Sequence, residues 1–331
     1  MKAVVWTKYG APDGLELREV ATPEPKDNEV LIKVHAATAS TPDTELRRLK
    51  LPFLFSVSLR LYIGLRKPTR ITILGTEFAG EIVATGQDVT RFRQGDPVLG
   101  YTALKMGTYA EYICLPENPA GLAGPIGLKP ANLSYAEAAA VPFGGLEALH
   151  TLKKANIRPG QKVLIVGAGG SIGTVAVQLA KHWGAEVTGV DHTVKLDMLR
   201  SIGADHVIDY TRQDFTKSGQ KYDVILDTID KSPFTASLRA LSESGTYLNA
   251  NPGLLGKLQW RLMVQKSRKK VIRWSGDYTA SNLLALKELV EAGTIKPVID
   301  RQYPLEEIAA AHRYVETGQK KGNVVVVVGG E

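Results

Sequence analysis

The sequence predicts an α/β protein in which a mostly β domain is interrupted by a doubly wound parallel-sheet domain. Three observations predict this fold class. A chain of 331 residues is longer than one hydrophobic core usually supports. Short strand patterns fill residues 1–120, whereas strand and helix patterns alternate from about residue 131. The pattern of strands and helices changes again in the last fifty residues, and we expect these residues to complete the first domain. The predicted limits are 1–125, 126–275 and 276–331.

The first domain is predicted from short apolar runs that Gly, Pro and Asp separate. The turn sequence Gln94-Gly95-Asp96 is one such separator. Residues 116–130 are rich in Gly and Pro, which is typical of a connection between domains. The expected strands are Lys2–Trp6, Glu29–Ala37, Glu81–Thr85, Pro97–Gly100 and Ala110–Cys114.

The second domain is predicted from repeated strand–helix–strand units, which form parallel sheets with helices on both faces. Lys162–Val166 has the continuous apolar character of a buried parallel strand. Apolar residues then recur at 172, 175, 176, 179 and 183, the spacing of a helix that Gly184 ends. The expected elements are strands Lys162–Val166, Glu186–Val190, His206–Ile208, Asp223–Leu226 and Gly245–Asn249, and helices Ser171–Trp183 and Leu196–Ile202.

The C-terminal part is predicted to contain two helices and one apolar strand. Gly293 ends the first helix, and Pro304 precedes the second. The expected elements are the helices Asn282–Glu291 and Leu305–Thr317 and the strand Asn323–Val328.

Composition limits the class of protein. Apolar residues make up 44% and charged residues 23%, a balance typical of ordered globular proteins. The single cysteine, Cys114, excludes a disulfide framework and a cysteine-rich structural zinc site. The N-terminal residues lack the apolar core of a signal peptide and are typical of a first strand. We therefore expect a cytoplasmic protein.

The basic residues are concentrated in two segments, 46–70 and 257–273, neither of which contains an acidic residue. Because their fourteen charges exceed the net charge of +7, the rest of the chain is net acidic. No nucleic-acid-binding module is visible, so we expect no nucleic acid partner. The two basic segments could bind an anionic substrate, a cofactor phosphate or a membrane surface, or they could be two solvated basic faces. The basic residues are Arg47, Arg48, Lys50, Arg60, Arg66, Lys67, Arg70, Lys257, Arg261, Lys266, Arg268, Lys269, Lys270 and Arg273.

The first basic segment contains an apolar stretch, Leu51–Leu65, that is too short to span a bilayer, which needs about 20 residues. We favour a lid over the active site, which implies an apolar substrate. A weak contact with a membrane surface is the alternative, because an apolar stretch with basic flanks is typical of interfacial segments.

A glycine-rich loop joins the first parallel strand to the helix that follows it. Glycine at such a turn lets the backbone approach a pyrophosphate, which the N–H groups at the helix N-terminus then hold. The glycines are spaced Gly167-x-x-Gly170-x-x-Gly173 rather than in the strict dinucleotide-binding pattern. The predicted cofactor-binding residues of the loop are Gly167, Ala168, Gly169, Gly170, Ser171, Ile172 and Gly173.

The acidic residue at the end of the second parallel strand bears on the choice between NADH and NADPH. A carboxylate at Asp191 would accept hydrogen bonds from the adenosine ribose and repel a 2′-phosphate. His192 and Lys195 would instead complement a phosphate. We lean slightly towards NAD(H).

Ligands of open α/β sheets bind at the carboxyl ends of the strands. Thr228 and Ile229 follow the fourth parallel strand, and residues 249–253 follow the fifth. We therefore expect Thr228, Ile229, Asn249 and Asn251 to contact the cofactor.

Five motifs resemble the medium-chain dehydrogenase/reductase superfamily, specifically its zinc-free, quinone oxidoreductase-like branch. The resemblance covers nearly the whole chain. It implies a GroES-like catalytic domain, an inserted Rossmann domain that binds NAD(P), an active site in the cleft between them, and a homodimer. It also implies cofactor contacts at Tyr210 and, near the nicotinamide, at Asn323. The motifs are Ile73–Gly80, Gly107–Tyr112, Ala138–Pro142, the glycine loop and Gly203–Tyr210.

Zinc-dependent relatives bind the catalytic metal with a Cys, a His and a Cys. The matching positions here are Ser40, Thr76 and Phe143. A phenyl ring cannot bind zinc, and hydroxyl groups are poor ligands beside thiolate or imidazole. We therefore expect no zinc.

Without zinc, protein hydrogen bonds have to polarise the substrate. The resemblance places Ser40, Thr41 and Asp43 on the loop that lines the cleft. Either hydroxyl group could present a proton or orient a water, while Asp43 is expected to support them; loop capping is the alternative role. Glu147 replaces a threonine that is common near the nicotinamide in relatives, and Glu77 is expected to make structural hydrogen bonds.

Other conspicuous side chains are expected to be structural. His35, His150 and His312 are isolated in the sequence, so we expect packed or surface roles for them. Tyr109 and Tyr112 belong to a family motif and are expected to lie in the core.

The resemblance and the residues together predict an NAD(P)H-dependent, zinc-independent reductase of a quinone, an activated alkene or a related carbonyl compound. A zinc-free alcohol or carbonyl dehydrogenase is the alternative enzyme. The alternative outside the enzymes is an adaptor that binds NAD(P)H at a membrane without turnover. This alternative arises because no acid–base pair is evident in the sequence.

Overall fold

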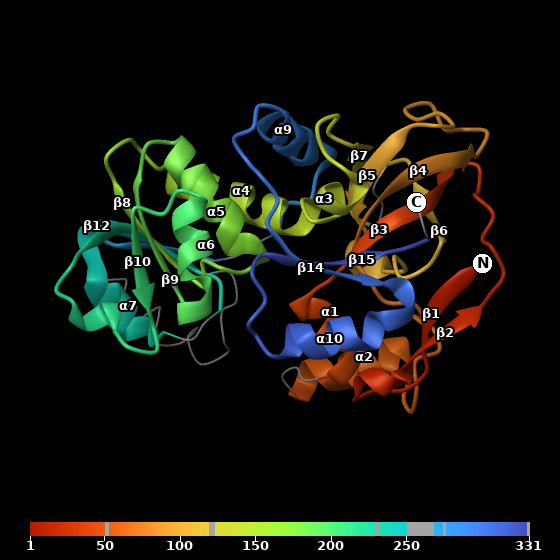
Figure 1. Cartoon of the computed structure of the whole chain (residues 1–331), viewed down its shortest axis with the longest axis horizontal. Coiled ribbons are helices and arrows are strands. Elements are labelled where there is room, and N and C mark those ends of the chain that lie inside the picture. The colour runs from red at the N-terminus through yellow and green to blue at the C-terminus, as the bar shows by residue number, and fades with distance from the viewer. Residues whose placement is uncertain (50–52, 119–122, 230–231, 250–267, 274–275, 330–331) are drawn as a thin grey trace. The chain divides into compact units, whose positions relative to one another are not determined.

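The computed structural model describes residues 1–49, 53–118, 123–229, 232–249, 268–273 and 276–329. The chain forms two compact units, and the predicted fold class is confirmed. The β unit comprises Met1–Phe143, Tyr278–Glu291 and Pro297–Glu331, and the parallel-sheet unit comprises Gly144–Asp277 and Ala292–Lys296 (Figure 1). The domain limits drawn from the sequence stay predictions. Asn251, Leu51 and most of the basic segment 257–273 lie outside the described residues.

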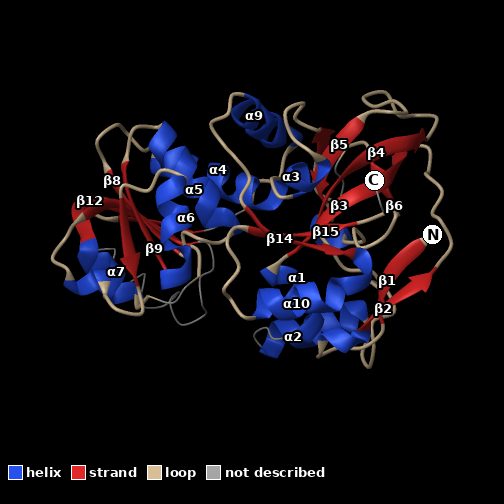
Figure 2. Ribbon diagram, in the orientation of Figure 1, coloured by secondary structure: helices blue, strands red, loops and turns tan. Residues whose placement is uncertain are grey.

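The β unit is organised around a sheet in which β14, β15, β3, β4, β5 and β7 are neighbours in that order, and β6 also pairs with β3 (Figure 2). β14 and β15 run parallel to each other, and the other pairs are antiparallel. A separate hairpin pairs β1 with β2. The strands are β1 (Lys2–Trp6), β2 (Leu15–Glu19), β3 (Glu29–Ala39), β4 (Glu77–Thr85), β5 (Pro97–Tyr101), β6 (Tyr112–Pro116), β7 (Ile126–Leu128), β14 (Ile299–Pro304) and β15 (Asn323–Val327).

Helices pack against several strands of this sheet. α10 buries Ile308, Ala311 and Val315, which recur at helical spacing, against the core of the β unit. α1 packs on α10. The helices are α1 (Thr41–Arg48), α2 (Phe53–Ile63), α3 (Tyr135–Ala139), α9 (Ala280–Glu291) and α10 (Ile308–Glu316). No helix in the described part of the chain combines the length and the apolar character of a membrane span.

In the described part of the parallel-sheet unit, six strands lie in the order β10-β9-β8-β11-β12-β13, all parallel. The strands are β8 (Lys162–Val166), β9 (Glu186–Asp191), β10 (His206–Asp209), β11 (Tyr222–Asp227), β12 (Leu241–Asn249) and β13 (Lys270–Arg273). The helices are α4 (Pro142–Ala155), α5 (Ser171–His182), α6 (Leu196–Ser201) and α7 (Phe234–Ala240). α5 packs on β8 and β9, so the glycine loop connects two elements that are held together.

Several elements differ from their predicted bounds. The strand expected at 110–114 is β6 at 112–116, because Ala110 instead makes a single bridge to Ala3. The first turn of the last predicted helix, Leu305–Glu307, is a 3₁₀ helix. The strands and α-helices that were not predicted are β2, β7, β13, β14, α1, α2, α3, α4 and α7. α2 occupies most of the apolar stretch that sequence analysis left without an assigned structure.

Candidate active site

The glycine loop turns sharply between β8 and α5. Gly167 has a φ of +77°, a left-handed conformation that favours glycine. The N–H groups of Gly167 and Ala168 donate to the Val190 carbonyl at 2.9 and 3.2 Å. The Thr228 hydroxyl donates to the Val166 carbonyl at 3.0 Å. The loop is therefore tied to the carboxyl ends of both β9 and β11.

The glycines of the loop are needed for different reasons. A Cβ at Gly167 would come within 3.0 Å of the Thr228 and Ile229 side chains, and one at Gly173 within 3.0 Å of two loop carbonyls. At Gly169 it would meet the Lys195 side chain at 2.5 Å. At Gly170 the nearest atom is the Gly167 carbonyl oxygen at 3.5 Å, an ordinary contact distance. Protein packing thus excludes a side chain at three of the glycines but not at Gly170.

Gly170 is also the N-cap of α5, with φ −88° and ψ −179° and no side chain to cap the helix. The first-turn N–H groups of a helix have no partner within the helix and favour an anion. The open space at Gly170 lies where such an anion would approach. The loop therefore fits the pyrophosphate of a dinucleotide.

Asp191 is buried at the end of β9 and faces the loop. Its carboxylate accepts the Gly169 N–H at 2.7 Å and the His192 N–H at 2.8 Å, and pairs with Lys195 Nζ at 3.1 Å. The side chains of Asp191 and Lys195 are only 5% and 8% exposed. From the sequence, Asp191 was expected to repel a 2′-phosphate and Lys195 to attract one. In the structure the two residues form one ion pair beneath the loop.

The other residues proposed to contact the cofactor are His192, Tyr210 and Asn249 in the parallel-sheet unit and Asn323 in the β unit. The ring of His192 is edge-on to Tyr210, with centroids 6.0 Å apart, and Tyr210 is 44% exposed. Burial, Asp191 and Asp209 raise the pKa of Tyr210. Asn249 is buried at the end of β12. Asn323 belongs to the β unit, where its amide donates to the Ala140 and Val298 carbonyls at 3.1 and 3.2 Å.

In the β unit, Ser40 and Asp43 begin α1 as a reciprocal capping box. The Ser40 hydroxyl donates to Asp43 Oδ2 at 2.5 Å and accepts from the Asp43 N–H at 3.3 Å, while the Ser40 N–H donates to Asp43 Oδ2 at 3.0 Å. Both residues are buried. Burial raises the pKa of Asp43 to about 6, against the hydrogen bonds from Ser40 that lower it. Thr41 is exposed at the first position of the helix.

Glu77, on β4, is fully buried and joins two other parts of the β unit. It accepts the Thr38 hydroxyl at 2.5 Å and the Phe143 N–H at 2.8 Å. Burial raises its pKa to about 7. The expected structural role is consistent with these hydrogen bonds.

The three positions that hold zinc in zinc-dependent relatives do not supply a donor set here. The ring of Phe143 packs against Tyr101, with centroids 5.4 Å apart, and has no donor atom. Ser40 gives its hydroxyl to Asp43. Among the described residues, no three His, Cys, Asp or Glu side chains lie close enough to hold a metal ion. These three positions therefore supply neither a thiolate nor an imidazole ligand.

A buried hydrogen-bond chain behind α1 was not predicted from the sequence, where Arg47 was only one member of a basic segment. The Arg47 Nε–H donates to His312 Nδ1 at 3.3 Å. The neutral His312 ring then carries its proton on Nε2, 3.1 Å from Tyr109 Oη, and Tyr109 donates to the Thr38 carbonyl at 3.2 Å. Burial and Arg47 lower the pKa of His312 to about 3. The expected core position of Tyr109 and packed position of His312 are confirmed.

The fold and the loop define a class: an oxidoreductase of two units, one of which is built to bind a dinucleotide. Two family models match, the alcohol dehydrogenase GroES-like domain over residues 26–124 and the zinc-binding dehydrogenase over residues 202–326. A 2-methylene-furan-3-one reductase from Solanum lycopersicum is 32% identical, over 98% of this chain and 79% of its own length. An NADPH-dependent alkenal/one oxidoreductase, chloroplastic, from Arabidopsis thaliana is 31% identical over the same shares.

Solved structures agree with these relatives. The quinone oxidoreductase from Coxiella burnetii has a TM-score of 0.87 and 30% identity, and the match covers 99% of both chains. The chain belongs to the quinone oxidoreductase-like branch of the medium-chain dehydrogenase/reductase superfamily.

Proposed function

We propose that this protein is an NAD(P)H-dependent, zinc-independent reductase of quinones or activated alkenes and carbonyl compounds. The observation that carries the proposal is the glycine loop at the N-terminus of α5, with space at Gly170 that the protein leaves open. Relatives named as alkenal/one and quinone oxidoreductases support the substrate class. The steady-state oxidation of NADH and NADPH with a panel of quinones and enones tests it, and the absence of turnover with every member would contradict it.

The cofactor supplies the hydride, and the chain supplies binding and a proton. The loop residues Gly167–Gly173 and the first turn of α5 would hold the pyrophosphate, with Thr228 and Ile229 beside it. Tyr210, His192, Asn249, Asn251 and Asn323 stay proposed contacts. The zinc-independent part of the proposal is supported by Ser40, Thr76 and Phe143, which offer no thiolate or imidazole.

We assign proton delivery to Ser40, with Asp43 behind it. Ser40 Oγ lies 2.5 Å from Asp43 Oδ2, and burial raises the pKa of Asp43 to about 6. In the protonated form that this pKa makes accessible, Asp43 would donate to Ser40 Oγ and leave the Ser40 proton free for the substrate. As the reduced substrate takes the Ser40 proton, the proton of Asp43 moves to Ser40 Oγ. Thr41, exposed at the next position, would orient the substrate or a water.

Replacement of Ser40 by alanine tests this assignment. Ser40→Ala is expected to lower kcat by about 10- to 100-fold, because a positioned proton donor is removed. Ser134→Ala is the matched control, because Ser134 and Glu137 form the same capping box at the start of α3. Each change removes a cap worth about 1 kcal/mol, and only the first should change kcat. Equal kcat values in the two variants would show that Ser40 only caps α1.

For the cofactor, we propose a slight preference for NADH, with Asp191 as the residue that disfavours the 2′-phosphate. Asp191→Ser is expected to shift the ratio of kcat/KM values towards NADPH by about tenfold, because the buried carboxylate is lost and Lys195 is left to pair with an anion. The kcat/KM values for both cofactors measure this shift. An unchanged ratio would refute the role of the carboxylate.

We also propose that the protein is a homodimer and that it is cytoplasmic. Its family supports the proposal of a homodimer. The cytoplasmic location is supported by Cys114, a buried free thiol, because disulfides are rare in the reducing cytoplasm.

A further inference from the structure

α2 has an inner and an outer face. Ile63 is 1% exposed and Leu59 is half-buried, and both pack on the core of the β unit. Val57, Arg60 and Leu61 share the opposite face, at i, i+3 and i+4. Val57 is 41% exposed and Leu61 is 67% exposed. The helix is therefore anchored by one side and presents large aliphatic side chains to solvent on the other.

The loop after α2 is folded back on the end of the helix and extends this surface. The N–H groups of Thr69 and Arg70 both donate to the Ile63 carbonyl at 3.0 Å. Arg60 donates to the Leu65 carbonyl at 3.2 Å. Leu65 is thereby held next to the outer face, and 65% of it is exposed. We call this surface the α2 face; it comprises Val57, Arg60, Leu61, Tyr62, Leu65, Arg66, Lys67 and Arg70.

The charges of the α2 face are all positive. Arg60, Arg66, Lys67 and Arg70 are exposed, and none of them forms an ion pair with an acidic group in the part of the chain that the structure describes. Two of them stack on aromatic rings: Arg60 lies 4.8 Å from the centroid of Tyr9, and Arg70 lies 4.9 Å from that of Tyr62. The segment that carries the exposed leucines thus carries four exposed cations that have no acidic partner among the described residues.

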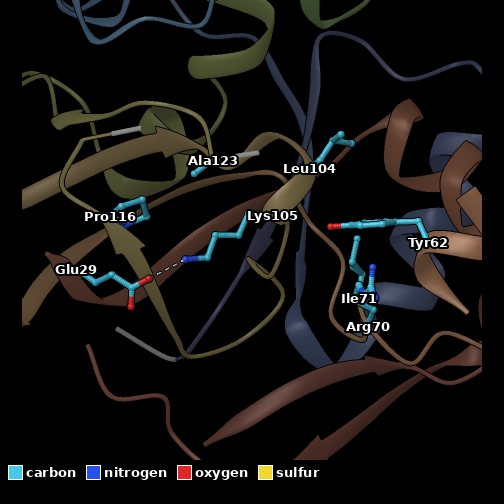
Figure 3. Close-up of a pocket in the computed structure, with 8 residues that line it drawn as sticks. All are labelled: Glu29, Tyr62, Arg70, Ile71, Leu104, Lys105, Pro116 and Ala123. Carbon is cyan, nitrogen blue, oxygen red and sulfur yellow. Dashed lines mark hydrogen bonds and ion pairs between the residues drawn. The ribbon is translucent and has the colours of Figure 1, made fainter. Parts of the chain in front are cut away.

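A pocket of about 340 Å³ adjoins the face (Figure 3). Tyr62 and Arg70 belong to both the face and the pocket, whose other wall includes Leu104 and Lys105. Lys105 pairs with Glu29 at 3.4 Å, and Leu104 is 49% exposed. The mixture of apolar and basic groups therefore continues beyond α2.

We propose that the α2 face docks on an anionic lipid bilayer, with α2 in the plane of the interface. Val57, Leu61 and Leu65 enter the boundary between head groups and acyl chains, and the four cations contact lipid phosphates. A second copy of the chain fits less well, because a two-fold interface through this face would bring like charges together. The helix has 11 residues, so it lies on the bilayer and does not cross it.

Flotation of the purified full-length protein with lipid vesicles tests the proposal. We expect binding to phosphatidylcholine vesicles that contain 30% phosphatidylglycerol, as a chosen probe, and at least tenfold weaker binding to phosphatidylcholine alone. Binding should weaken as salt is raised from about 0.05 to 0.5 M, because salt screens the cations. Arg66→Glu/Lys67→Glu should lower the partition coefficient at least tenfold, since each basic residue near an anionic surface contributes about a factor of five. Leu61→Asp/Leu65→Asp should do the same through the apolar contacts.

Matched variants separate this face from a general effect of charge. Lys153→Glu/Arg158→Glu makes the same charge change on exposed residues of the parallel-sheet unit, and Leu284→Asp changes a leucine that is 56% exposed on α9. Both should bind vesicles like the unaltered protein. The proposal is overturned if the unaltered protein does not float with anionic vesicles or if the control variants lose binding equally. It is also overturned if Leu61→Asp/Leu65→Asp reduces the molecular mass of the lipid-free protein in solution, because the face then joins two copies.

Discussion

Gly170→Ala is expected to weaken NAD(P)H binding at least about tenfold while it changes the melting temperature by no more than about 2 °C. The protein leaves 3.5 Å to the nearest atom at this position, so the methyl group disturbs no packing. The backbone conformation, φ −88° and ψ −179°, is open to alanine. Glycine is a better N-cap than alanine, so the change costs the helix roughly 0.5–1 kcal/mol. The added methyl group would instead occupy the space into which we place the pyrophosphate.

Gly173→Ala is the matched control for this prediction. Its methyl group would come within 3.0 Å of the Gly167 and Ala168 carbonyl oxygens, so α5 has to move away from the loop. Thermal unfolding and fluorescence titration with NADH and NADPH should show stability and affinity falling together in Gly173→Ala. In Gly170→Ala, affinity should fall alone. Unchanged affinity in Gly170→Ala would place the pyrophosphate elsewhere.

Arg47→Leu is expected to lower the free energy of unfolding by about 3–5 kcal/mol, because it breaks an ion pair whose arginine is fully buried and leaves the buried His312 Nδ1 without a donor. The Arg47 side chain is 0% exposed and contacts Glu316, the Gly10 carbonyl and His312. The guanidinium group of Arg47 on α1 therefore joins α10 to the loop that contains Gly10.

Arg48→Leu provides the comparison. Arg48 is the next residue on α1, is 40% exposed and lies 3.8 Å from the same glutamate. Exposed pairs of this kind contribute about 0–1 kcal/mol. Urea unfolding of both variants measures the difference. Equal losses would mean that the buried chain from Arg47 to Tyr109 contributes no more than a surface ion pair.

The sequence predicted the parallel-sheet unit better than the β unit, for a physical reason. β8 is apolar at consecutive positions because both of its faces are buried, and α5 has a continuous helical spacing of apolar residues. α1 has only eight residues, with a proline and two arginines among them, so its apolar pattern was too short to recognise. The pair Ser40 and Asp43 could have revealed its start, because a serine followed by an acid three residues later is typical of a capping box.

The candidate site was predictable in its residues but not in their contacts. The position of Asp191 at the end of a strand follows from the order of elements. Its hydrogen bond to Gly169 and its ion pair with Lys195 depend on how β9 and the loop meet in three dimensions. Arg47 was counted in a basic segment whose role was left open, because net charge per segment does not show which side chain points inward. The free space at Gly170 is likewise invisible in a spacing pattern.

The place of β15 in the sheet has a consequence for the order in which the protein is made. β15 lies between β14 and β3, with Val324 opposite Ala39, so the main sheet of the β unit contains a late strand in its interior. All the described strands of the parallel sheet have been synthesised once Arg273 is added. During translation this sheet can therefore complete its hydrogen bonding between strands before β15 pairs with β3. The end of β3, residues 36–39, therefore lacks its β15 partner until residues 323–327 have been synthesised and have left the ribosome.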